Sequence, residues 1–208
     1  MDMKQLFLTS NGTEAIDSIV AKLPKKPSEY KLAFITTASE VELGDLHWLR
    51  EEKDKLSSVG FNIIEFSITN MSPFEINKKF LDIDIIYLAG GNTFYLLDQV
   101  IKTGADVIIR RFIDNGGVYI GSSAGSMIAG IRIDLVGSID DITKAPDLKS
   151  NGLGIIDSVI LPHWGSNHFK DRYYKTFFDI YVTGVKIIPI SDGQYLWVQD
   201  DNIKLVQS

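Results

Sequence analysis

Cysteine is absent from this 208-residue chain. The protein therefore cannot form disulfides, bind a metal through thiolates or use a cysteine as a nucleophile. If a sharp turn in this chain presents a nucleophile, that nucleophile must be a hydroxyl group.

A surplus of basic residues is also missing, since 27 Asp and Glu outnumber 21 Lys and Arg. A net charge of −6 argues against nucleic acid as a partner, because nothing would neutralise the phosphates. No apolar run approaches the roughly 20 residues that cross a bilayer, so no membrane partner is expected. The N-terminus has no basic segment followed by a long apolar one, so we expect no signal peptide and a cytoplasmic location.

What the chain does contain is an alternation of apolar strand-like runs and amphipathic helical segments. This pattern predicts an α/β fold, a three-layer sandwich with a mostly parallel doubly wound sheet, in one domain over residues 1–208. The last two strands are predicted to form a C-terminal β-hairpin. The predicted strands are 4–8, 32–36, 62–66, 83–88, 118–121, 155–161, 186–190, 195–199 and 203–206. The predicted helices are 13–23, 41–58, 73–80, 93–103, 105–115, 124–130 and 169–182.

The segment Gly121-Ser122-Ser123-Ala124-Gly125 lies where a predicted strand gives way to a predicted helix. It fits the G-x-S-x-G pattern of a nucleophile elbow, in which a strand–turn–helix lifts one serine above the sheet edge. Ser123 would be the exposed serine, beside the free N–H groups of the helix N-terminus. The pentapeptide alone is equally compatible with a helix N-terminus that Ser122 or Ser123 merely caps.

Other chemically useful residues follow predicted strands, at the edge where doubly wound sheets bind ligands. They are Gly91, Ser123, His163 and Asp192. A serine nucleophile needs a base, and His163 at a strand end is better placed for this than His47 within a helix. His168, at the start of a predicted helix, is a candidate cap or substrate contact.

An acidic residue should orient the histidine, and two backbone N–H groups should stabilise an oxyanion. Asp192 is the expected acid, while Asp157 lies at the opposite, starting end of its strand. The amides of Ala124 and Gly91 are the expected oxyanion donors. These parts together indicate acyl transfer.

Residues 132–151 are polar and irregular, and are interpreted either as a wall of the substrate site or as a variable surface loop. His163 and His168 are five residues apart, which matches no strong metal-ligand spacing. The glycine-rich turns lack a nucleotide-binding pattern. We therefore expect no metal and no cofactor.

Three motifs carry a resemblance to a known family. Residues 87–94 (YLAGGNTF), 121–125 (GSSAG) and 161–163 (LPH) are, in this order, similar to the peptidase E family of serine peptidases, whose wider group includes the cyanophycinases. The resemblance implies an α/β sandwich like that of class I glutamine amidotransferases, which carry Cys where this chain has Ser123. It also implies Ser123 as nucleophile, His163 as base, and the Gly91 and Ala124 amides as the oxyanion hole.

The chain departs from that family in two places. The third triad member of the family is usually Glu, whereas the matching position here is Asp192. Peptidase E removes Asp from the amino end of dipeptides, and Asn92 and Arg172 are the substrate-binding residues that the resemblance implies. Arg172 is only an approximate match, because the segment after His163 is shorter here, which leaves Asp specificity open.

The sequence thus predicts a metal-independent serine peptidase that acts on dipeptides or short peptides, as a monomer or homodimer. One alternative is a cyanophycinase-like hydrolase of β-aspartyl bonds. Another is an inactive member of the fold that binds a small molecule.

Overall fold

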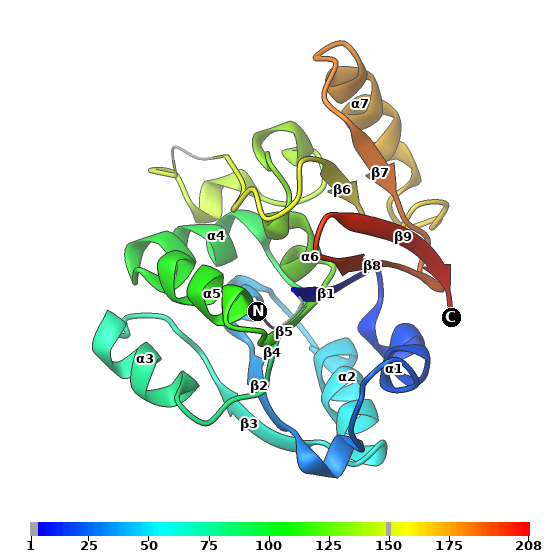
Figure 1. The fold of residues 1–208 in the computed structure, drawn as a ribbon. Coiled ribbons are helices and arrows are strands. Elements are labelled where there is room, and N and C mark those ends of the chain that lie inside the picture. Colours follow the sequence, from blue (N-terminus) through cyan, green and yellow to red (C-terminus); the bar gives the residue numbers. More distant parts are fainter. Residues whose placement is uncertain (1–3, 149–150) are drawn as a thin grey trace.

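The computed structural model describes residues 4–148 and 151–208 and is built around a seven-stranded sheet (Figure 1). The strand order is β3-β2-β4-β5-β1-β8-β9. The first five strands in this order pair in parallel, and β8 and β9 add an antiparallel hairpin beside β1. The bounds are β1 Gln5–Thr9, β2 Lys31–Ile35, β3 Asn62–Phe66, β4 Ile85–Leu88, β5 Val118–Ser122, β8 Gln194–Gln199 and β9 Asn202–Gln207.

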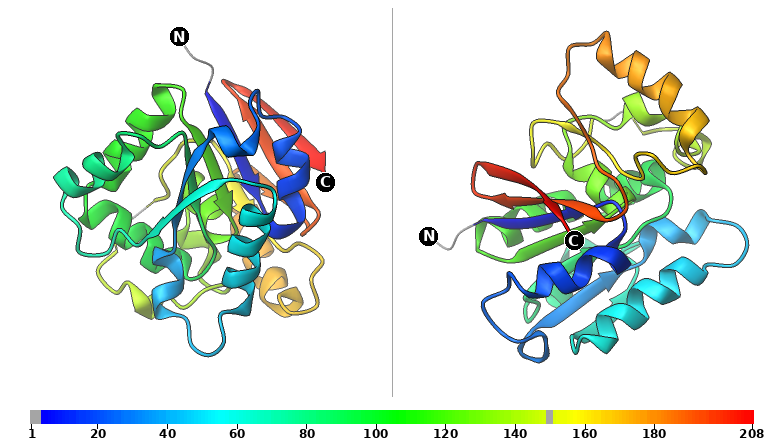
Figure 2. Two further views of the ribbon diagram at one scale, coloured as in Figure 1. Left: turned by 90° about the horizontal axis from the view of Figure 1, so that it is seen from below. Right: turned by 90° about the vertical axis from the view of Figure 1, so that its right-hand side faces the viewer.

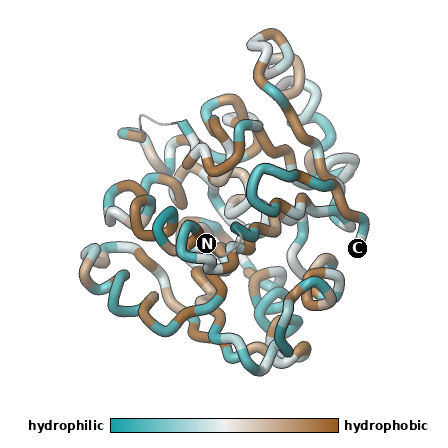
Figure 3. Tube along the Cα trace, viewed as in Figure 1, coloured by the Kyte–Doolittle hydropathy of each residue, from teal (hydrophilic) through white to brown (hydrophobic). Residues whose placement is uncertain are grey.

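Helices cover both faces of this sheet, as the predicted α/β sandwich requires (Figures 1 and 2). One face is covered by α1 Gly12–Val20 and α2 His47–Ser58. The other is covered by α3 Pro73–Phe80, α4 Thr93–Lys102, α5 Ala105–Asp114 and α6 Ala124–Ala129. Hydrophobic and hydrophilic residues alternate along α1 to α5 (Figure 3), so these helices present an apolar side to the sheet, whereas every residue of α6 is buried.

Two hydrophobic clusters fill the two interlayer spaces, because successive side chains of a strand point to opposite faces. In β1, Leu6 and Leu8 belong to the cluster under α3 to α6, whereas Phe7 belongs to the cluster under α1 and α2. All three side chains are fully buried. The unbroken apolar runs of the central strands therefore reflect burial on both faces.

The strands that precede His163 and Asp192 are not part of the main sheet, which corrects the expectation that all site residues follow strands of one sheet. β6 Val159–Leu161 and β7 Ile187–Pro189 pair in parallel as a separate two-stranded sheet. The predicted strand 155–161 is shortened because the amides of Ile155 and Ile156 bond the Ala129 carbonyl at the end of α6. Between β6 and β7 the chain forms α7 Lys170–Tyr181, which projects from the body of the molecule (Figures 1 and 2).

Two further segments differ from the predicted pattern. The helix predicted from residue 41 begins at His47, because the preceding residues form the 3-10 helix Thr37–Val41 and a loop. The irregular segment 132–151, of which 149–150 lie outside the described residues, contains the 3-10 helices Asp134–Val136 and Ile142–Lys144. A further 3-10 helix is Pro27–Glu29.

No helix within the described ranges has the length and apolar character needed to cross a membrane.

Candidate active site

Ser123 sits at a strained turn between β5 and α6. Its φ of 46° and ψ of −104° are unusual for a residue other than glycine. The glycines on either side are required by close packing: a Cβ on Gly121 would lie 2.6 Å from the carbonyl carbon of Gly125, and one on Gly125 would lie 2.3 Å from the carbonyl oxygen of Leu88. The G-x-S-x-G spacing thus lets a strand and a helix meet at a sharp turn.

Three neighbouring parallel strands deliver backbone or side-chain groups to this turn. Ser10 follows β1, Gly91 follows β4 and Ser123 follows β5, and β5 pairs with both of the other two strands. The Ser123 amide donates to the carbonyl of Thr9 at the end of β1, over 3.1 Å. The centre of the sheet edge therefore fixes the backbone of the candidate nucleophile.

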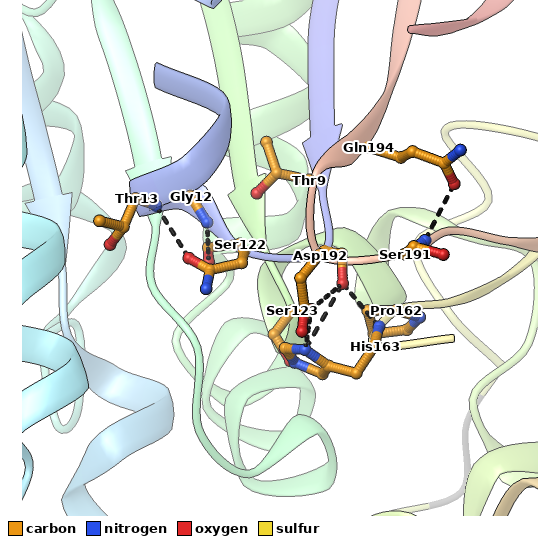
Figure 4. Close-up of polar contacts among 12 residues, drawn as sticks. Thr9, Gly12, Thr13, Ser122, Ser123, Pro162, His163, Ser191, Asp192 and Gln194 are labelled. Atoms are coloured by element: carbon orange, nitrogen blue, oxygen red, sulfur yellow. Dashed lines mark hydrogen bonds and ion pairs between the residues drawn. The ribbon is translucent and has the colours of Figure 1, made fainter. Parts of the chain in front are cut away.

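His163 and Asp192 meet Ser123 from the two-stranded sheet (Figure 4). The distance from His163 Nε2 to Ser123 Oγ is 3.0 Å, and the distance from His163 Nδ1 to Asp192 Oδ1 is 2.5 Å. The β6 and β7 ends are held together by backbone bonds, among them the one from the Ile190 amide to the Leu161 carbonyl. The residues form a Ser-His-Asp arrangement in which the carboxylate reaches the ring nitrogen remote from the serine.

The hydrogen bonds around Asp192 favour the ionised form of this carboxylate. The hydrogen bond with His163 lowers the pKa of Asp192, and the Ser10 hydroxyl adds to this against the effect of burial. An ionised Asp192 accepts a hydrogen bond from Nδ1–H, which leaves Nε2 free to accept the Ser123 proton.

Ser10 is a site residue that the sequence reasoning missed. Its hydroxyl donates to Asp192 Oδ1 over 2.7 Å and accepts from the His163 amide over 2.6 Å. Ser10 is fully buried, and these two hydrogen bonds connect the separate two-stranded sheet to the end of β1. Its position two residues after the predicted strand 4–8 was the available signal, because the rule used for the other strand ends applies to it equally.

The two backbone amides expected to stabilise an oxyanion are those of Gly91 and Ala124. Within the described residues, neither the Gly91 amide nor the Ala124 amide donates one of the backbone hydrogen bonds found outside regular helices and strands. Ala124 begins α6, where helical N–H groups have no intrahelical acceptor. Gly91 has a φ of 127°, and a Cβ there would lie 2.3 Å from the Ala38 carbonyl oxygen. Only glycine fits this turn.

A cavity of about 660 Å³ opens over Ser123 and His163. Its size is that of a small-molecule site. Ile139 and Asp140 line it, so part of the irregular segment 132–151 does form a wall of the site. The other lining residues are Ser10, Asn11, Thr13, Glu14, Glu42, Trp48, Glu51, Glu52, Gly90, Gly91, Ser122, His168, Phe169 and Arg172.

The two expected substrate-binding residues have different surroundings. Arg172 lines the cavity, and its Nη1 donates to the Ile139 carbonyl over 2.9 Å. Asn92 does not line it: the side chain is 2% exposed, caps α4 by accepting from the Tyr95 amide, and donates to the Asp141 carbonyl. Asn92 thus holds the turn that carries Gly91, and we do not place it on the substrate.

Aromatic side chains surround the candidate base. The Phe169 ring stacks on the His163 ring with centroids 4.9 Å apart. His168 lines the cavity and packs edge-on against Phe169. Across residues 4–148 and 151–208, no group of three or more His, Cys, Asp or Glu side chains could hold a metal ion.

Glu52 of α2 is a second residue that the sequence reasoning missed, and nothing in its helical setting distinguishes it. It lines the cavity yet is only 5% exposed. It accepts a short hydrogen bond from Ser122, the neighbour of Ser123. Burial raises the pKa of Glu52 to about 7, against the opposing effect of its hydrogen-bond donors.

Comparisons with known proteins agree with this geometry. Residues 6–206 match Peptidase family S51. An uncharacterized peptidase of Listeria innocua is 33% identical over 202 residues, covering 97% of this chain and 95% of its own. Peptidase E of Shewanella denitrificans is 29% identical over 154 residues, covering 71% of this chain and 64% of its own.

Solved structures give the same result. The crystal structure of a candidate peptidase E from Listeria monocytogenes superposes with a TM-score of 0.90 at 32% identity, and covers 99% of both chains. A peptidase from an acI-B1 Actinobacterium has the same fold, with a TM-score of 0.73 at 19% identity over 99% of this chain and 88% of its own. With a family match that spans nearly the whole chain and a triad at its sheet edge, this protein belongs to peptidase family S51, a family of serine peptidases.

Proposed function

We propose that this protein hydrolyses dipeptides or other short peptides through an acyl-enzyme at Ser123. The observation that carries the proposal is the contact of Ser123 Oγ with His163 Nε2, whose other ring nitrogen contacts Asp192. A serine hydroxyl becomes a competent nucleophile only with a base at this distance.

In the first half-reaction, His163 takes the Ser123 proton as Oγ attacks the substrate carbonyl carbon. The carbonyl oxygen becomes an oxyanion, for which the amides of Gly91 and Ala124 are the donors. Each such donor is worth about 3–4 kcal/mol of transition-state stabilisation. His163 then protonates the leaving amine, the C–N bond breaks, and an ester to Ser123 remains.

In the second half-reaction, water attacks the ester while His163 takes a proton from it. The same amides stabilise the second oxyanion, and Ser123 recovers its proton as the acid product leaves. Asp192 stays ionised throughout and stabilises the imidazolium form of His163 that appears in both steps.

A short substrate is supported by the size of the cavity and by the wall that Ile139 and Asp140 build. A preference for an N-terminal Asp would need Arg172 as its partner, since this is the cavity's arginine. Arg172 already bonds the Ile139 carbonyl. Burial raises the pKa of Asp140, and the nearby Arg172 charge is among the groups that partly oppose this. We therefore propose short-peptide hydrolysis with no requirement for an acidic residue.

The test is hydrolysis of a dipeptide panel by wild type and by Ser123→Ala, with a chelator present. The panel contains α-Asp-X, β-Asp-X, Glu-X, Lys-X and neutral dipeptides. We expect turnover of several α-dipeptides, at least about 10³-fold lower in Ser123→Ala and unchanged by the chelator. Equal turnover by the two proteins would refute the role of Ser123, and exclusive cleavage of β-Asp-X would support a β-aspartyl hydrolase instead.

A further inference from the structure

Phe169, directly before α7, lies flat against the candidate base. The Phe169 ring and the His163 imidazole are nearly parallel, at 10° to each other, with centroids 4.9 Å apart. This is an offset-stacked arrangement, which aromatic pairs prefer to a face-to-face sandwich. Phe169 also lines the cavity over Ser123, so the stack belongs to the site itself.

The backbone of His163 is fixed independently of Phe169. The His163 amide donates to Ser10 Oγ over 2.6 Å, and its φ of 59° is unusual for a residue other than glycine. The next amide, that of Trp164, donates to the Ile190 carbonyl just after β7. What remains to be set is the orientation of the imidazole about its own side-chain torsions.

The plane of the imidazole is the weakly determined part of this orientation. The outer side-chain torsion of a histidine joins an sp³ to an sp² carbon and has broad minima, so no rotamer preference fixes the plane. The hydrogen bonds with Asp192 and Ser123 hold the two ring nitrogens (Figure 4), but the ring can still tilt about the line that joins these nitrogens. Such a tilt turns the Nε2 lone pair away from Ser123 Oγ, and hydrogen bonds weaken steeply at poor angles.

A flat neighbour opposes this tilt, provided that the neighbour is itself held in place. Tilting would drive one edge of the imidazole into the Phe169 ring and lift the other edge off it. The Phe169 amide donates to the Ser166 carbonyl, and the Phe169 carbonyl accepts from the Tyr173 amide in the first turn of α7. The Phe169 ring packs against the rings of His168 and Tyr173, with centroids 4.7 and 6.0 Å away.

Arg172 connects the same ring to the wall of the cavity. Its guanidinium carbon lies 5.5 Å from the centroid of the Phe169 ring, within the range of a cation–π contact. The Arg172 side chain also donates to the Ile139 carbonyl, in segment 132–151. Phe169 is therefore held by both α7 and this wall, as a group that fixes a catalytic side chain must be.

We propose that Phe169 is a positioning residue whose ring holds the imidazole plane of His163, so that Nε2 points at Ser123 Oγ. The proposal rests on the proposed function, because it names a residue that serves the same base. Phe169 forms and breaks no bond in the reaction. Its flat face is the required property, so an apolar side chain without such a face does not replace it.

Three variants separate the flat face from apolar bulk. Phe169→Leu keeps an apolar side chain but removes the face, whereas Phe169→Tyr keeps the face. Phe178→Leu makes the first exchange at an exposed phenylalanine of α7 that does not line the cavity over Ser123. Circular dichroism and thermal unfolding check that each variant is folded.

Hydrolysis of the best-cleaved dipeptide of the panel gives kcat and KM for each protein. We expect Phe169→Leu to lower kcat by about 10- to 100-fold and to change KM by less than about twofold, because a misplaced base slows the chemical step. Phe169→Tyr and Phe178→Leu should stay close to wild type. A higher KM with unchanged kcat would overturn the proposal, since Phe169 would then be a substrate contact. An equal loss of kcat in Phe169→Tyr and Phe169→Leu would overturn it as well.

Two further measurements do not depend on the choice of peptide. Diisopropyl fluorophosphate labels an activated serine: a bond forms between Ser123 Oγ and phosphorus, fluoride leaves, and the base takes the hydroxyl proton. We expect this labelling, followed by mass spectrometry, to be about tenfold or more slower in Phe169→Leu. Crystal structures of the variants show the ring directly. The imidazole should be tilted away from Ser123 or occupy two orientations in Phe169→Leu, and be unmoved in Phe169→Tyr.

An imidazole with the wild-type orientation in Phe169→Leu overturns the proposal, whatever the rates. Failure of the proposed function is a separate result. If the wild-type protein cleaves no peptide, the ring orientation in these structures still decides for or against Phe169. If peptides are cleaved at Ser123 and Phe169→Leu keeps the wild-type kcat, the enzyme stands and the positioning role is lost.

Discussion

The two halves of the candidate triad are held by regions of very different construction. The Ser123 turn lies at the centre of the seven-stranded sheet, where β5 is paired on both sides and every residue of α6 is buried. His163 and Asp192 follow strands of only three residues, and all three residues of β7 are partly exposed.

The comparison shows that the contact between Ser123 and His163 joins a buried region to a more exposed one. The main sheet fixes the candidate nucleophile and the proposed oxyanion donors through backbone packing that tolerates no added methyl group at Gly91 or Gly121. The smaller sheet carries His163, the candidate base, and the hydroxyl of Ser10 joins this sheet to the larger one. We therefore expect large effects from backbone changes in the first region and from side-chain polarity in the second.

The sharpest test of the smaller region is Asp192→Asn. Loss of the carboxylate removes the acceptor that orients His163 and stabilises its imidazolium form, so kcat should fall by about 10³–10⁴-fold. Peptide hydrolysis measures the loss, with Asp201→Asn in the β8–β9 turn as a control of equal charge change. A loss of less than about tenfold would show that Asp192 does not serve the histidine.

The main-sheet region is tested by Gly91→Ala. The new methyl group would lie 2.3 Å from the Ala38 carbonyl oxygen, so the turn must shift and the oxyanion donor with it. We expect kcat to fall by about 10²–10³-fold with little change in KM. Gly154→Ala is the control, because its φ is also positive, at 60°, yet open space surrounds it. Equal effects of the two substitutions would show that strain alone, and not the position of the amide, matters.

The buried carboxyl of Glu52, beside the main sheet, should make the free energy of unfolding depend on pH. Its folded-state pKa of about 7 lies above the ordinary 4.5, so the folded protein binds the proton more tightly than the unfolded chain does. The free energy of unfolding should therefore fall as pH rises from about 4.5 to 7, and the full cost above pH 7 is about 3 kcal/mol. Urea denaturation at pH 5 and pH 8 measures this. In Glu52→Gln the fall between these two pH values should be smaller by most of this amount, because part of the cost is already present at pH 5, whereas Asp54→Asn should behave as wild type.

The connection between the two regions is tested by Ser10→Ala. The hydroxyl is a positioning group for Asp192 and His163, so its loss should lower kcat by roughly tenfold and leave the chain folded. The pH profile of kcat should also shift, because Asp192 loses a donor that favours its ionised form. Ser57→Ala, an exposed serine of α2, is the control. No change in either the rate or the pH profile would show that the hydrogen bonds of Ser10 are not needed to position His163 and Asp192.

Local signals predicted much of this molecule well. The alternation of apolar and amphipathic runs gave the layers and the C-terminal hairpin, because strands buried on both faces must be apolar throughout. The glycine spacing around Ser123 predicted the sharp turn, since only glycine allows the backbone approaches found there.

Long-range partners were the part that the sequence could not supply. The apolar run at 155–161 reads as one strand, but the amides of Ile155 and Ile156 are taken by the Ala129 carbonyl of a distant helix. Asn92 stands in a motif that suggests substrate binding, yet its hydrogen bonds go to its own helix and to Asp141.

By itself the sequence determined the type of chemistry: a chain without cysteine, with serine at an elbow and His163 at a strand end, can perform acyl transfer with a hydroxyl nucleophile. Only the tertiary structure decided which side chains support it, through contacts between residues far apart in the chain. Ser10 meets His163 across 153 positions, and Ser122 meets Glu52 across 70. Such contacts cannot be predicted from residue spacing along the chain, because they form only when the sheet and its covering helices pack together.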